Sequence, residues 1–298
     1  MHPAEAQTMD RYRISPITLL GIAPLLLAQP PEEKPEPVIA TFKGTRLYNF
    51  HTSETPAHRH LEFRVAHRFG DLRQGYANFF GIDAGATVRI SLGYGVLPWA
   101  EIGLERTGAG KWWNGYTKLR LLRQTAPRGM PISLTYIGMA FLTEATDPLR
   151  YRVLSDRWEY LHQLLIARKF SRRFSVLMGA AWLHQNMSLT PQALNDWLWA
   201  LGGLRFKLFS RVTLIAEGAL PLWKNALSSS APFPNYHIPW SIGTEIETGG
   251  HVFQLGLTSA AGLSENQVLL TDRPLLRLGF NISRIFSLQG GPTYGKRE

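Results

Sequence analysis

The sequence predicts an all-β fold, an antiparallel up-and-down transmembrane β-barrel of about twelve strands. Three observations predict it. Apolar and polar residues alternate along about a dozen segments, short and long connections alternate between them, and aromatic residues gather near the segment ends. Bacterial outer-membrane barrels combine these features, because they have an even number of strands with tight turns at one end and longer loops at the other.

The composition is compatible with this class. The chain has 298 residues and 45% of them are hydrophobic, but beyond residue 30 no uncharged apolar run reaches ~18 residues, so no transmembrane helix is expected there. The absence of cysteine excludes disulfides, thiolate metal sites and cysteine nucleophiles. The net charge of +10 comes from Lys and Arg spread evenly along the chain, so we expect no nucleic-acid partner. Outer-membrane lipid and lipopolysaccharide are the expected partners of such a basic envelope protein.

The N-terminus is expected to be an export signal. Arg11 and Arg13 precede an apolar stretch over 14–27, and Ala28 is suited to precede a cleavage site. We therefore expect residues 1–28 to be a signal peptide that directs the chain to the outer membrane of a Gram-negative-type envelope. An uncleaved apolar anchor is the alternative. Residues 29–58, which begin with a Pro- and Glu-rich stretch, are expected to form a partly flexible periplasmic lead-in.

The barrel domain is predicted over residues 59–286, with a C-terminal tail at 287–298. About 20 residues per strand and connection suit membrane-crossing strands of about 9–11 residues. The connections after even-numbered strands are short, and those after odd-numbered strands are longer except at 108–111. Eleven to fourteen strands remain compatible with the pattern. The strands are expected, to within ~2–4 residues, at 59–69, 85–95, 100–107, 112–123, 131–143, 157–170, 174–186, 196–209, 211–220, 237–247, 251–260 and 274–286.

The two faces of the first strand differ in character. In LEFRVAHRFG (61–70), Leu61, Phe63 and Val65 share one face, while Glu62 and Arg64 lie on the other. In a membrane barrel the apolar face contacts lipid and the charged face points into the lumen. The same alternation recurs in later strands, whereas 157–170 is apolar on both faces.

The charged faces predict a lumen lined by residues of both signs. A mixed lining favours no strong selection for one sign of ion. The lumen is either an open channel or one occluded by salt bridges and an inserted loop, for which residues 70–85 are the candidate. Further inward acids are Glu101, Glu105 and Glu247. The lumen-lining residues are predicted to be Glu62, Arg64, Arg68, Arg89, Lys118, Arg120, Arg205, Lys207, Glu217, Glu245 and Arg277.

Aromatic residues near the strand ends predict two girdles at the membrane–water interfaces. Seven lie near the longer connections: Trp112, Trp113, Trp158, Trp182, Trp197, Trp199 and Trp240. Four lie near the tight turns: Trp99, Phe170, Phe174 and Phe209.

We expect no catalytic, cofactor or metal site. A barrel-embedded lipid hydrolase needs a Ser with a His base at the outer lipid boundary. His162, His184 and Ser188 are suitably placed, but no local motif joins them. His58 and His60 share a strand face and lack an evident third metal ligand.

Several segments resemble the DUF5777 family of bacterial β-barrel proteins, common in the Bacteroidota and related phyla. The resemblance covers about residues 40–286 and is carried by ATFKGTRLYNFHTSET, LEFRVAHRFGD, NFFGID, LLRQ, QLLIARKFS, EIETGGHVFQL and GFNISRIF. It implies an outer-membrane-type barrel and no assigned activity, substrate or catalytic residue.

The functional expectation is a passive pore or small-solute transporter that is not an enzyme. A non-transporting scaffold that docks a periplasmic or surface partner is one alternative, and the lipid hydrolase is the other. The amphipathic last strand, PLLRLGFNISRIF, is of the kind that the barrel-assembly machinery recognises, so this machinery is an expected partner.

Overall fold

The computed structural model describes residues 34–148, 150–187, 195–222 and 237–288. The elements described below belong to one compact unit, Pro35–Glu298. The predicted signal peptide and nearly all of the predicted tail lie outside the described residues. Among the described residues, no helix is long and apolar enough to cross a membrane.

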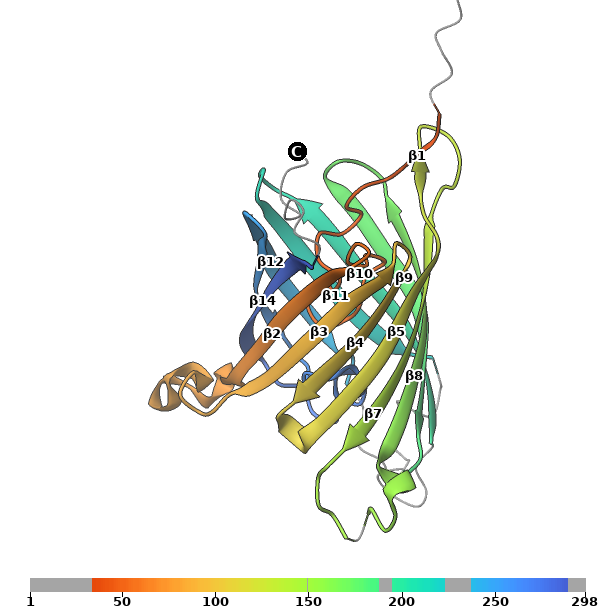
Figure 1. Cartoon of the computed structure of the whole chain (residues 1–298). Helices are drawn as coiled ribbons and strands as arrows, with labels where there is room; N and C mark the ends of the chain where they lie inside the picture. Colours follow the sequence, from red (N-terminus) through yellow and green to blue (C-terminus); the bar gives the residue numbers. More distant parts are fainter. Residues whose placement is uncertain (1–33, 149, 188–194, 223–236, 289–298) are drawn as a thin grey trace, which may run out of the picture. The chain divides into compact units, whose positions relative to one another are not determined.

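Twelve antiparallel strands within the described residues close into a barrel (Figure 1). Each pairs with its neighbours along the chain, and β14 closes the sheet on β2 through pairs such as Phe286 with Leu61. The prediction of an up-and-down barrel is confirmed, and every strand overlaps its predicted range. The strands are β2 (His60–Asp71), β3 (Thr87–Leu97), β4 (Ala100–Thr107), β5 (Trp112–Leu122), β7 (Ser133–Thr143), β8 (Trp158–Lys169), β9 (Phe174–Gln185), β10 (Asp196–Lys207), β11 (Val212–Pro221), β12 (Trp240–Thr248), β13 (His251–Thr258) and β14 (Arg277–Ser287).

The two ends of the barrel differ in the length of their connections. The end where β2 begins and β14 ends, here called the short-turn end, carries the connections 98–99, 123–132, 170–173, 208–211 and 249–250. The opposite end, here called the long-loop end, carries 72–86, 108–111, 144–157, 186–195, 222–239 and 259–276. A short pairing of β1 (Glu36–Pro37) with β6 (Thr125–Ala126) extends the short-turn end.

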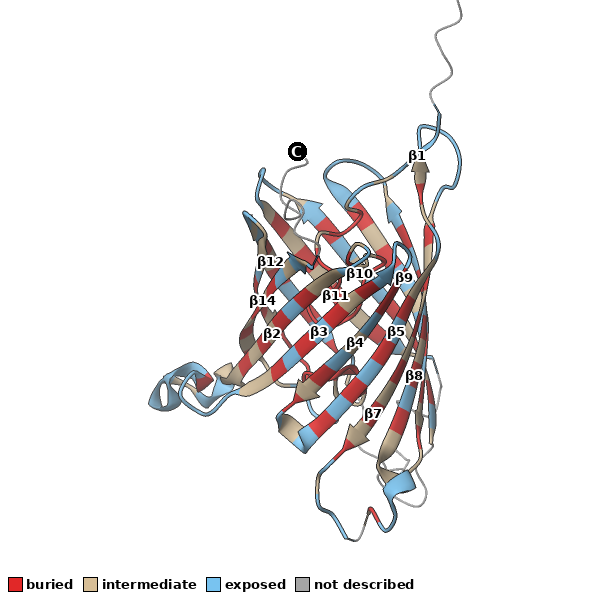
Figure 2. Ribbon diagram, viewed as in Figure 1, coloured by how far each residue is buried: buried red, intermediate tan, exposed pale blue. Residues whose placement is uncertain are grey.

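The wall alternates between exposed and buried residues along each strand (Figure 2). Ile90 and Leu92 on β3 are exposed on the outer surface, while Arg89 and Ser91 between them are buried inside. A closed sheet leaves no strand edge unpaired, so its backbone polar groups are satisfied without water. The wall therefore has the apolar exterior and hydrogen-bonded backbone that a lipid environment requires.

The aromatic prediction is confirmed for residues that point outward. Trp113, Trp182 and Trp240 are exposed near the long-loop end. At the short-turn end the exposed rings are Trp99, Phe170, Phe174 and Phe209.

Three of the tryptophans predicted for the girdle are instead inside the barrel. Trp112, Trp197 and Trp199 are buried, so their assignment to the girdle is wrong. Residues two apart on a strand share a face, and Trp197 and Trp199 share the inner face of β10 with Arg205. The phase of the strand, rather than proximity to its end, determines which side a ring takes.

Candidate functional site

The lumen is filled by a segment that precedes the first barrel strand. Residues 41–53, here called the plug segment, enter from the short-turn end (Figure 1), and every residue among them except Lys43 is buried. The lead-in expected over 29–58, partly flexible and periplasmic, therefore includes a part that the barrel wall encloses. No residue of the plug segment pairs with a barrel strand.

The plug segment folds as a tight hairpin. The amide of Thr52 donates to the carbonyl of Thr45 (2.8 Å) and the amide of Leu47 donates to that of Phe50 (2.9 Å). The turn leaves three backbone amides without a partner in the segment. The Glu217 carboxylate on β11 accepts all three, from Tyr48 (3.0 Å), Asn49 (2.7 Å) and Phe50 (3.1 Å). A buried ionised acceptor makes such bonds stronger than neutral ones, so Glu217 anchors the tip.

The polar wall also binds the side chains of the turn. The Arg68 guanidinium donates to Asn49 Oδ1 (2.9 Å) and lies 3.9 Å from the centre of the Tyr48 ring. Asn281 Nδ2 donates to the Tyr48 carbonyl (2.9 Å), and the Tyr48 hydroxyl donates to the Gly256 carbonyl (2.9 Å). The tip is therefore held from β2, β13 and β14 as well as from β11.

The base of the hairpin is fixed by β2, β4 and β5. Lys118 Nζ donates to the carbonyls of Thr45 (3.0 Å) and Glu54 (2.9 Å) and lies 3.3 Å from a carboxylate oxygen of Glu101. The Thr45 hydroxyl donates to Glu62. Four of the predicted lumen residues thus contact the plug segment directly: Lys118 and Glu62 at the base, and Arg68 and Glu217 at the tip.

A second insertion fills the lumen from the long-loop end. Residues 259–271, here called the inner loop, contain the short helix α1 (Glu265–Leu269) and are mostly buried. Arg89 Nη1 donates to the Leu263 carbonyl (2.6 Å), and Asn266 Nδ2 donates to Glu159 Oε2 (2.8 Å). The inner loop is therefore held from β3 and β8.

The loop predicted as a plug is not in the lumen. Residues 70–85 fold away from the wall at the end of β2 (Figure 1), with Tyr76 85% and Phe79 56% exposed. Only the length of this connection favours it as a plug, and the inner loop occupies the place predicted for it.

Arg46 joins the two insertions inside the barrel. Its guanidinium donates to Glu265 Oε1 of the inner loop (2.5 Å) and to Glu105 Oε1 of the wall (2.7 Å). It also donates to the Asn49 carbonyl (2.9 Å) and lies 2.6 Å from His51 Nε2. All of these side chains are buried. The two insertions, which enter from opposite ends, therefore meet inside the barrel.

The other half of the lumen is apolar. The inner faces of β7–β11 form one cluster with Phe42, Leu47 and Phe50 of the plug segment and Val268 and Leu269 of the inner loop. Burying a side chain such as Leu47 or Phe50 stabilises by roughly 1.5–3 kcal/mol. The wall members are mainly Ile137, Met139, Phe141, Leu161, Leu165, Leu177, Ala181, Leu183, Trp197, Trp199, Leu201 and Ile215.

The structure places nine of the predicted lumen residues inside the barrel: Glu62, Arg64, Arg68, Arg89, Lys118, Arg205, Glu217, Glu245 and Arg277. The other two, Arg120 and Lys207, are only half-buried and lie towards the short-turn end. Arg120 Nη2 donates to the Pro98 carbonyl of a tight turn (2.5 Å). The buried set surrounds the plug segment and the inner loop rather than an open channel.

The histidines considered for catalysis lie on the outward-facing side of β8 and β9 and make local contacts. His162 Nδ1 is 2.7 Å from the Tyr136 hydroxyl, and His184 Nδ1 is 2.9 Å from Asp196 Oδ1. Ser188 lies outside the described residues. His58 and His60 bond to the backbone, and no cluster of potential metal ligands occurs among the residues that the structure describes.

Gly203 provides a sensitive test of the plug contact. A Cβ atom at this inner position of β10 would overlap Leu47 Cδ1. We expect Gly203→Val to destabilise the plugged state by roughly 1–3 kcal/mol through overpacking, and to make residues 41–53 more accessible to protease in the folded barrel. Gly202→Val is the matched control, because a Cβ atom there meets nothing within 4 Å. Equal protease accessibility in the two variants would contradict the contact.

A comparison with protein families agrees with the barrel. The model of a family described as "Membrane bound beta barrel domain (DUF5777)" matches residues 42–286. No curated protein matches the sequence. The solved structures that are similar include the NanC porin, at 7% identity and a TM-score of 0.48, covering 76% of this chain and 98% of that one. The KdgM porin is 7% identical with a TM-score of 0.47, and the match covers 76% of this chain and 99% of that one. An active-site mutant of outer membrane phospholipase A from Escherichia coli is 13% identical with a TM-score of 0.45, and the match covers 77% of this chain and 91% of that one.

Proposed function

We propose that this chain, which belongs to the DUF5777 family of membrane-bound β-barrel domains, is a gated channel of the outer membrane that its own plug segment closes. In this proposal the short-turn end faces the periplasm and the long-loop end faces outward, as is usual for bacterial barrels. The expectation of a passive pore or small-solute transporter is thereby narrowed to a pore that conducts when the plug segment leaves the lumen.

One observation carries the proposal: the wall that the plug segment and the inner loop cover is charged. Replacing buried ion pairs by well-packed apolar residues is often neutral or stabilising, so permanent filling does not require charges. A lumen that fills with water does benefit from them. Among the described residues, the buried wall charges are Arg64, Arg68, Arg89, Lys118, Arg205 and Arg277 against Glu62, Glu101, Glu105, Glu159, Glu217 and Glu245.

The second candidate is a scaffold whose lumen never opens. The apolar half of the lumen favours it, because Trp197, Trp199 and their neighbours lose their packing when the plug segment leaves. The two candidates differ in whether displacement of the plug segment produces a conducting path.

Planar-bilayer recordings of the full chain separate them. We expect no current steps in buffer and reversible steps when urea is added on the short-turn side. The plug segment is held by side-chain contacts without strand pairing, so it should be released before the closed sheet unfolds. Protease cleavage of residues 41–53, with the barrel still folded, reports the release. Release without conductance would favour the scaffold and contradict the channel.

A further inference from the structure

An apolar loop and a basic pocket lie side by side at the long-loop end. The connection 72–86 contains the turns η1 (Leu72–Gln74) and η2 (Tyr76–Gly81) and projects sideways beyond the wall (Figure 1). It exposes Tyr76, Phe79, Phe80 and Ile82. Large exposed apolar groups that lie together mark contacts with proteins or membranes.

The backbone of this loop has a defined conformation that is packed against the end of β2. Gly81, at φ +80°, packs so closely on the end of β2 that a Cβ atom would lie 2.7 Å from the Asp71 carbonyl oxygen. The Phe80 amide donates to the Gly75 carbonyl (2.8 Å). Phe79 and Phe80 have φ of 43° and 52°, values that bulky residues rarely adopt. The fold thus keeps the aromatic rings outward at a cost to the backbone.

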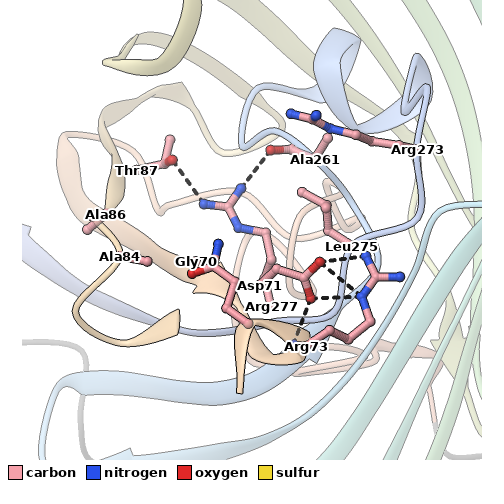
Figure 3. A pocket seen from close by; sticks show the side chains of 12 residues that line it. Gly70, Asp71, Arg73, Ala84, Ala86, Thr87, Ala261, Arg273, Leu275 and Arg277 are labelled. Atoms are coloured by element: carbon pink, nitrogen blue, oxygen red, sulfur yellow. Dashed lines mark hydrogen bonds and ion pairs between the residues drawn. The ribbon is translucent and has the colours of Figure 1, made fainter. Parts of the chain in front are cut away.

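The pocket beside this loop is rich in arginine. It has a volume of about 850 Å³, and its charged lining residues are Arg73, Arg273, Arg277 and Asp71 (Figure 3). Arg277 already makes hydrogen bonds within the protein. It donates to the carbonyls of Phe69 (2.6 Å) and Ala261 (2.6 Å) and to the Thr87 hydroxyl (3.0 Å). Arg273 is exposed, and Figure 3 shows its guanidinium without a bond to any residue drawn.

Arg73 connects the pocket to the loop. Its Nε donates to both carboxylate oxygens of Asp71 (3.0 and 2.9 Å). Its Nη2 donates to Asp71 Oδ2 (2.5 Å) and to the Pro274 carbonyl (2.5 Å), while the side chain remains 57% exposed. Three arginines against one carboxylate leave a positive pocket, and guanidinium groups bind phosphate in bidentate geometry.

We propose that this pocket and the loop 72–86 together bind the phosphorylated headgroup of a lipid in the outer leaflet. Arg73 and Arg273 face the phosphate, and Tyr76, Phe79 and Phe80 lie in the interface with the acyl chains. The occupant is lipid rather than protein because the loop projects sideways at the strand ends, where aromatic residues of barrels meet headgroups. The inference rests on the proposed outward orientation of the long-loop end.

A binding experiment tests the charge contribution. Bisphosphorylated lipid A is titrated into the detergent-solubilised full chain and counted by native mass spectrometry. We expect the double variant Arg73→Gln with Arg273→Gln to weaken lipid A binding on the order of tenfold or more, because it removes charge-assisted hydrogen bonds to phosphate. Lys111→Gln with Arg152→Gln is the matched control, because it removes the same charge from exposed residues at the same end. Equal weakening in both pairs would overturn the site.

Two further arms identify the source of the phosphate and the role of the loop. Millimolar inorganic phosphate should not displace lipid A, and efficient displacement would mean a free-anion site.

Because the chain has no cysteine, a dye can be placed at Tyr76→Cys and, as a control, at Val153→Cys on another long loop. Brominated lipids should quench only the first dye; equal quenching, or none, overturns the lipid contact. The current steps that urea induces should be unchanged in the variant that combines Arg73→Gln with Arg273→Gln. A failure of the lipid-site proposal can therefore be distinguished from a failure of the channel proposal.

Discussion

Deletion of residues 41–53 is expected to turn a silent barrel into a conducting channel. The plug segment pairs with no barrel strand, so its removal leaves the closed hydrogen-bonded sheet intact. It does remove the hairpin that occupies Glu217, Arg68 and Lys118. These side chains are then free to bind water, and single-channel recording should show steps of defined size.

The open channel should discriminate weakly between cations and anions. Seven Arg or Lys and seven Glu are buried among the described residues, and Arg46 and Glu265 belong to the two insertions, so six of each sign remain on the wall. A pore that strongly selects ions carries a ring of one sign. We therefore expect a reversal potential close to zero in asymmetric salt.

Two companion variants make the deletion informative. Removal of residues 34–39, which lie outside the plug segment, should leave the barrel silent. The inner loop keeps its own contacts to Arg89 and Glu159 after the deletion, so a second variant also replaces 260–270 by a short Gly-Ser connection. Its conductance should exceed that of the single deletion. Silence of the single deletion alone would contradict closure by the plug segment, and silence of both deletion variants, in folded and heat-modifiable protein, would contradict a channel.

The barrel was predictable because each of its features is local in the sequence. Alternation with period two assigns a face to each residue of β2 or β3, and a one-residue error would place Arg64 or Arg89 in lipid. Loop lengths are likewise read directly from the chain. Position along the strand misassigns Trp197 and Trp199 to the girdle, because the alternation of β10 places both on the inner face with Arg205.

The plug segment was not predicted, because its burial depends on contacts far apart in sequence. Glu217 lies 169 residues beyond Tyr48, and Glu265 lies 219 residues beyond Arg46. Neither pairing has a local pattern. A weaker signal was present: the Pro- and Glu-rich composition ends near Ala40, and Phe42, Leu47, Tyr48 and Phe50 follow. A flexible lead-in has few such residues.

The second large effect is expected from Arg46→Ala. The substitution leaves the buried carboxylates of Glu105 and Glu265 without their common cation. Removing one partner of a buried ion pair costs roughly 3–5 kcal/mol. If this cost falls on the plugged state, the fraction of open channels rises on the order of 100-fold or more. Single-channel open probability and protease access to residues 41–53 should increase together.

Two controls separate the buried charge from a general loosening of the segment. Lys43→Ala also removes a cation from the plug segment, but its pair with Glu247 is 30% and 40% exposed. Such a pair contributes only about 0–1 kcal/mol, so this variant should stay closed. Arg46→Met combined with Glu105→Gln and Glu265→Gln removes the buried charges together and should restore closure. If Arg46→Ala behaves like Lys43→Ala, the buried ion pairs do not hold the gate; if the triple variant stays open, the shape and bonds of Arg46, rather than its charge, close the lumen.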